Sequence, residues 1–112
     1  MLNERLNQRI REALKTIPGV EEKKMFRGLA FMVDGKMCIT ASDQHMMCRV
    51  DPAIHHELIQ RKGCQTMVMG GKEYIGYVRI EEDALTSVKE FNFWIKQALD
   101  FNPKAKASKK NK

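Results

Sequence analysis

Residues 25–40, MFRGLAFMVDGKMCIT, contain the pattern that decides the fold. Two apolar runs, LAFMV and KMCIT, lie on either side of Asp34 and Gly35. An Asp-Gly pair between apolar runs is typical of a two-residue type I′ turn, so the stretch predicts an antiparallel β-hairpin with Asp34 and Gly35 as its turn residues. The pair Arg27-Gly28 interrupts the pattern just before the hairpin, either as a binding site or as a kink between two strands.

The residues before this stretch predict one helix and one strand. Apolar side chains recur at helical spacing, which predicts an amphipathic helix over residues 2–16: Leu2, Leu6, Ile10, Leu14 and Ile17. Pro18-Gly19 ends that helix. The segment VEEKKMF is compatible with a solvent-facing strand. After the hairpin, a turn at residues 42–44 leads into HMMCRV, so the first half of the chain predicts three or four antiparallel strands.

The second half predicts a short helix, one or two strands and a long helix. Asp51-Pro52 is a helix start, and the following helix stops at Gly63. CQTMVMGGKEYIGYVRI is either two strands around Gly70-Gly71 or a loop and one strand, with residues 74–80 as the surer strand. A capping region at residues 82–83 precedes a last helix with one apolar stripe: Leu85, Val88, Phe91, Trp94 or Ile95, and Ala98.

This order predicts an α+β fold with two layers, an antiparallel sheet with helices packed on one face. Residues 1–101 form one domain, and residues 102–112, which are rich in lysine, are expected to be a disordered tail. Several strands carry large apolar residues at successive positions, so both faces of the sheet are expected to be partly apolar. A twofold partner is the simplest cover for the second face, which makes a homodimer possible.

The basic charge belongs to the tail and not to the body of the protein. The formal net charge is +6, and five lysines without an acidic residue lie near the end of the chain: Lys104, Lys106, Lys109, Lys110 and Lys112. The remainder therefore carries +6 − 5 = +1. No apolar run approaches the roughly 20 residues that span a bilayer, and the polar N-terminus is unlike a signal peptide. The three cysteines are then expected to be reduced thiols in a cytoplasmic protein without a membrane partner.

Enzymatic and metal chemistry find little support in the motifs. If the turn at residues 42–44 pairs Ala41 with His45, then Cys38 lies opposite Cys48, but no second pair of ligands completes a zinc site. An activated thiol at Cys48 or Cys64 remains an alternative, although no local signature of a nucleophile is present. We expect no cofactor, no metal and no catalytic residue.

Binding of another macromolecule is the other class of function. The tail lysines, Arg27 beside two phenylalanines, and Arg79 are the residues for contact with nucleic acid, which we expect to be weak and independent of sequence. Eight methionines favour an adaptable apolar surface for a protein partner, although methionine also fills ordinary cores.

The segments MFRGLAFMVDGKM, CRVDP, GYVRI and FNFWIKQAL, followed by a lysine-rich end, resemble the N-terminal domain of the TfoX/Sxy competence-regulator family from about residue 20 onward. The family usually shows Met-Phe-Gly-Gly where this chain has Met-Phe-Arg-Gly at residues 25–28, so Arg27 replaces a glycine and Gly28 is kept. The resemblance favours a bend or bulge at Gly28 over a binding site at Arg27. It implies a fold of the secretion-chaperone type.

The same resemblance implies a regulatory function without enzymatic activity. We expect an adaptor module that acts through protein–protein contact in transcription regulation, with an unidentified partner. The alternative is a weak, non-specific binder of nucleic acid that uses the basic C-terminal tail.

Overall fold

The structure is a computed structural model of the 112-residue chain, and it describes residues 3–25 and 28–105. The elements in order are α1 (Glu4–Leu14), β1 (Val20–Met25), β2 (Gly28–Val33), β3 (Lys36–Ser42), β4 (His45–Arg49), η1 (Pro52–Ile54), α2 (His55–Leu58), β5 (Cys64–Met69), β6 (Lys72–Glu81), η2 (Glu82–Leu85), α3 (Val88–Phe101) and η3 (Asn102–Lys104). The predicted α+β order is confirmed, and both segments around Gly70-Gly71 are strands.

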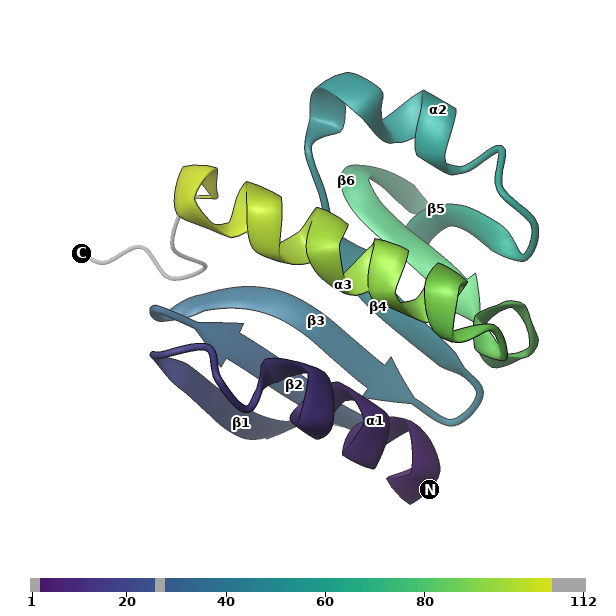
Figure 1. The fold of residues 1–112 in the computed structure, drawn as a ribbon. Coiled ribbons are helices and arrows are strands. Elements are labelled where there is room, and N and C mark those ends of the chain that lie inside the picture. Colours follow the sequence, from purple (N-terminus) through teal and green to yellow (C-terminus); the bar gives the residue numbers. More distant parts are fainter. Residues whose placement is uncertain (1–2, 26–27, 106–112) are drawn as a thin grey trace.

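The strands form one antiparallel sheet in the order β1-β2-β3-β4-β6-β5. Its two edges are β1 and β5. Helices α1 and α3 lie across one face of the sheet, and the short helix α2 packs against β6 near the β5 end of the sheet (Figure 1). The structure is therefore two-layered, with one sheet face covered by helices and the other without a helix.

The core lies between the sheet and the two long helices. Alternate residues on the strands face it, as the cross-strand set Phe31, Ile39 and Cys48 shows. From α3, Trp94 packs into this core with no exposed surface. Asn3 begins α1 by accepting a hydrogen bond from Leu6 N, and Ser87 begins α3 by accepting one from Glu90 N.

The opposite face is also buried at its centre. Ala30, Thr40 and Met47 form a cross-strand row on that face, and each has only 4% of its surface exposed. Lys23 and Arg79 extend the row at its two ends. The chain's own residues thus cover these apolar groups, so the centre of this face does not require a partner.

The turn between β2 and β3 has the backbone that its sequence predicts. Asp34 has a φ of 53° and Gly35 a φ of 77°, and a type I′ turn requires positive φ at both positions. Gly28 opens β2 directly after residues 26–27, and the irregularity in this part of the sheet lies elsewhere, between Phe31 and Met32. No register shift lies at Gly28 among the described residues, and a bend just before it would fall on residues 26–27, which lie outside the described residues. The lack of a side chain at Gly28 matters because the Ala41 carbonyl lies against its Cα.

The predicted register of the next turn is wrong by one residue. Ser42, not Ala41, pairs with His45, so the turn has two residues instead of three. Cys48 consequently pairs with Ile39. The cross-strand Cys38–Cys48 pair that the three-residue turn would have made does not form.

Two helix predictions also need correction. The segment after Asp51 is a 3-10 turn followed by a four-residue helix, shorter than expected, although Asp51 does accept a hydrogen bond from Ala53 N. The segment after Glu81 is another 3-10 turn, and α3 begins only after Ser87. Val88 therefore lies in the first turn of α3 with 68% of its surface exposed, outside the apolar stripe.

Two residues beyond residue 101, the expected end of the domain, are buried. Asn102 is buried, and its Nδ2 donates to Val33 O at 3.3 Å while its carbonyl accepts from Lys36 Nζ at 3.1 Å. Ala105 is also buried. The rest of the expected tail, residues 106–112, lies outside the described residues, as does Arg27. Across residues 3–25 and 28–105, no helix has the length and apolar character needed to cross a membrane.

Candidate functional site

The outer half of the β5–β6 hairpin projects beyond the rest of the sheet. β6 pairs with β4 only through residues 77–81, whereas its residues 72–74 pair only with β5. The register shifts between Thr66 and Met67, where residues 75–77 of β6 have no partner on β5. We call residues 67–75 the hairpin tip.

The hairpin tip exposes large apolar side chains. Val68 is 52% exposed, Met69 53% and Ile75 42%. Gly70 and Gly71 make the turn with φ values of 59° and 77°. Three of the five large apolar side chains with the greatest exposure in the described residues thus lie on one hairpin, which is typical of a contact surface.

The edge of β5 is open along the same hairpin. Its sequence, CQTMVM, contains no charged residue, and no strand pairs with its outer side in the described sheet. A shallow hollow runs beside it, lined by Ile59, Cys64, Gln65, Thr66, Val68, Glu73 and Arg79. An uncharged open edge offers backbone N–H and C=O groups to an added strand.

His55 fixes α2 against this hairpin. Its Nδ1 accepts a hydrogen bond from Gly76 N at 2.9 Å, so the neutral ring carries its proton on Nε2, which donates to Thr66 Oγ1 at 2.8 Å. The side chain has no exposed surface, and burial lowers the pKa of His55, with a smaller contribution from the neighbouring His56. Both ring nitrogens are engaged, which makes His55 a structural clamp and not a free base.

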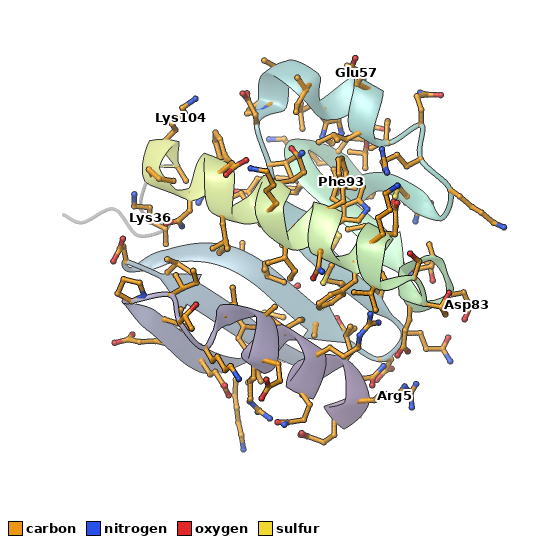
Figure 2. The ribbon with its side chains drawn as sticks, in the orientation of Figure 1. Arg5, Lys36, Glu57, Asp83, Phe93 and Lys104 are labelled. Atoms are coloured by element: carbon orange, nitrogen blue, oxygen red, sulfur yellow. The ribbon has the colours of Figure 1, made fainter. Side chains whose placement is uncertain are left out.

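Arg61 connects the same region to α3. Its guanidinium lies 3.8 Å from the centre of the Phe93 ring and binds Glu90 through two hydrogen bonds of 2.9 and 2.8 Å. Phe93 lies on the side of α3 that faces α2 (Figure 2). Trp94 Nε1 also donates a hydrogen bond to Glu90. The Glu90 carboxylate therefore holds both Arg61, which precedes β5, and Trp94 in place.

The thiols are poorly suited to nucleophilic catalysis. Burial raises the pKa of Cys38 to about 11 and that of Cys64 to about 11, and it raises the pKa of Cys48 well above its ordinary value. A catalytic thiol needs the opposite shift, because the thiolate is the nucleophile. Within the described residues, no three His, Cys, Asp or Glu side chains lie close enough together to hold a metal ion.

Comparison with protein families decides what kind of domain this is. Residues 12–102, most of the chain, match the model of the TfoX N-terminal domain. The chain belongs to this family. No curated protein and no solved structure matches the chain. The TfoX N-terminal domain is a regulatory family linked to competence, and it is not known as an enzymatic one.

In this TfoX N-terminal domain, the matched segment contains the whole sheet and ends at Asn102, the residue buried against Val33. The described basic residues that the sequence singled out lie apart. Arg79 is on the sheet face without helices and pairs with Glu81 at 3.1 Å, whereas Lys104 follows α3 at its C-terminal end (Figure 2). Arg27, Lys106, Lys109, Lys110 and Lys112 lie outside the described residues.

The hairpin tip of the TfoX N-terminal domain is not among the candidate sites that the sequence predicts. Gly70-Gly71 indicates a turn, and the flanking TMVM segment is uncharged. The sequence alone does not show that β6 extends beyond the end of its pairing with β4. The available signal was the contrast between this uncharged strand and VEEKKM at the other edge.

Proposed function

We propose that this TfoX N-terminal domain is a non-enzymatic regulatory adaptor that binds an extended segment of a protein partner along β5 and the hairpin tip. The observation that carries the proposal is the apolar, uncharged open edge formed by β5, with Val68, Met69 and Ile75 exposed beside it. Strand addition suits this edge because backbone hydrogen bonds supply affinity and alternate side chains supply selectivity.

The surrounding structure supports binding by a preformed surface. His55 fixes α2 against β5 and β6, and Arg61, in the segment just before β5, binds Glu90 on α3. A partner strand would therefore add to an already ordered edge, which lowers the entropy cost of association. Raised thiol pKa values and a doubly engaged histidine are consistent with a role without covalent chemistry.

The test compares partner capture by three forms of the full chain. Val68→Lys combined with Met69→Lys places two charges on the tip and should abolish capture of any partner that uses this edge. Val88→Lys is the matched control, because Val88 is even more exposed but lies at the start of α3. Proteins retained by the wild type and by Val88→Lys, and lost from the double variant, are the expected partners.

Hydrogen exchange then locates the contact. Amide exchange in β5 should slow when a captured partner is added to the wild type, because added strand pairing protects the outward N–H groups. Partners that bind all three forms equally, without protection in β5, would contradict the proposal. The weak nucleic-acid binding predicted for the lysine-rich tail stays a separate prediction, tested by the salt dependence of DNA binding with and without residues 106–112.

A further inference from the structure

The other edge strand of the sheet, β1, differs from β5 in its charge and in the regularity of its pairing. β1 has the sequence VEEKKM and pairs with β2 through all six residues without a register shift. Five of its six residues are exposed, and in the described sheet no strand lies beyond it (Figure 1). β1 is thus a regular, open edge of full length, whereas β5 is interrupted at Thr66.

The backbone groups of β1 that point outward can be assigned. Asp34 N donates to Gly19 O at 3.0 Å, so residue 19 and the odd-numbered residues that follow it bond toward β2. The N–H and C=O groups of the even-numbered residues, Val20, Glu22 and Lys24, therefore point away from the sheet. These three residues are centred on Glu22.

Charge along β1 is self-complementary when a second copy is added by a twofold axis. An axis perpendicular to the sheet keeps side chains of each face together, so the central residue of the pairing faces itself. Centred on Glu22, the pairing sets Glu21 opposite Lys23 of the second copy, twice over. It also sets Val20 opposite Lys24 of the second copy. The outward-pointing N–H and C=O groups of all three residues in each strand then have hydrogen-bond partners.

The residues on each face fit this pairing. Glu21 and Lys23 lie on the face without helices, are exposed, and make no ion pair with any other described residue. On the helix face, the two Glu22 carboxylates meet, but each is already held by Arg11 through hydrogen bonds of 2.7 and 3.0 Å. If the pairing were centred on Lys23 instead, the two Lys23 side chains would face each other on the sheet face without helices, and neither has a carboxylate partner among the described residues like the Arg11 partner of Glu22. Val20 would also be left without a partner residue.

We propose that β1 is a homodimer interface, in which two copies join their sheets antiparallel through Glu22-centred pairing of β1. Charged residues usually protect an edge strand from pairing, but the order Glu-Glu-Lys-Lys excludes arbitrary partners while attracting a copy of itself. The dimer joins both sheets into one and leaves the two β5 edges free at its ends. This interface is independent of the proposed function of β5.

The test is a charge-swap series measured by sedimentation equilibrium from about 1 μM to about 1 mM protein. Wild type should dimerise, more weakly at high salt. Lys23→Glu faces glutamates with glutamates, and Glu21→Lys faces lysines with lysines, so each should raise the dimer Kd roughly tenfold or more. The double variant with both changes should restore dimerisation. An equimolar mixture of the two single variants should form a heterodimer.

Four outcomes would overturn the proposal. A wild type that stays monomeric over the whole range removes the interface. A dimer that ignores Lys23→Glu but is lost in the Val68→Lys, Met69→Lys variant assigns the contact to β5. If Lys24→Glu abolishes the dimer while the changes at residues 21 and 23 do not, the two strands pair in a different register. If both single variants weaken the dimer, but neither the double variant nor the mixture of single variants restores it, then residues 21 and 23 do not pair across the interface. Thermal unfolding of each variant verifies that the monomer fold is intact.

Discussion

Gly28 at the start of β2 lies so close to the backbone carbonyl of Ala41 on β3 that a Cβ at position 28 would overlap the carbonyl oxygen. The backbone of Gly28 is not in the left-handed region, so the requirement is for space. We expect Gly28→Ala to lower the free energy of unfolding by about 2 kcal/mol or more, because two paired strands must move apart.

Gly35→Ala is the matched control for this prediction. Nothing lies within 4 Å of a Cβ at Gly35, whose φ is 77°, so only the conformational cost of about 1 kcal/mol applies there. Urea unfolding of both variants measures the difference. Equal losses would show that the overlap at Gly28 relaxes freely.

Asn7 on α1 is buried, and neither its Oδ1 nor its Nδ2 has a hydrogen-bond partner among the described residues. Burying an amide without partners costs free energy, so Asn7→Leu should stabilise the domain by about 1–2 kcal/mol. Asn102→Leu is the contrasting variant and should destabilise, since Asn102 donates to Val33 O. A loss of stability in Asn7→Leu, measured by chemical denaturation, would contradict the prediction.

Stability should fall as pH decreases below about 6.5, partly through His55. Its folded pKa is below the ordinary value of 6.5, so the unfolded chain binds the proton more readily. The stabilisation is complete above pH 6.5 and is lost progressively as pH falls toward the folded pKa. The charge of Glu73 opposes this lowering of the His55 pKa in part.

The variant His55→Leu should show a shallower dependence of unfolding free energy on pH than the wild type. His56→Gln should keep most of the wild-type dependence, because burial is the main cause of the lowered pKa of His55 and His56 makes only the smaller contribution. His45, whose pKa is also lowered by burial, remains in both variants and cancels in the comparison. Equal slopes in wild type and His55→Leu would rule out the clamp as the cause.

All three thiols should react slowly in the native protein at neutral pH. Cys38 and Cys48 are buried, and Cys64 is partly exposed with a pKa of about 11, so the order of reaction should begin with Cys64. Absorbance of a disulfide reagent in buffer and in denaturant measures the rates. A single thiol that reacts faster in buffer than in denaturant would reveal an activated cysteine and challenge the non-enzymatic proposal.

Local signals predicted those parts of the fold that depend on neighbours in sequence. The Asp34-Gly35 turn, the helix over Leu6, Ile10 and Leu14, and the order of elements follow from turn chemistry and periodicity. The turn after Ser42 was misjudged because two- and three-residue loops share the same polar residues, and one residue of register moved Cys48 away from Cys38.

The sites depend on distant pairings and were harder to predict. The exposure of Val68 follows from where β4 ends, and the clamp of His55 follows from an irregularity in β6 around Gly76. Neither has a local signature. The charge order of residues 21–24 was visible in the sequence, but its meaning required knowing that β1 is an edge strand.

The irregularity between Thr66 and Met67 also divides the hairpin into a part that shares the core and a part that forms the proposed contact surface. The base of the β5–β6 hairpin shares the core, whereas the tip makes its strand pairs only with itself. Substitutions in the tip should therefore alter the proposed contact surface at little cost to global stability, so this surface can vary in sequence while the packed part of the domain stays constant.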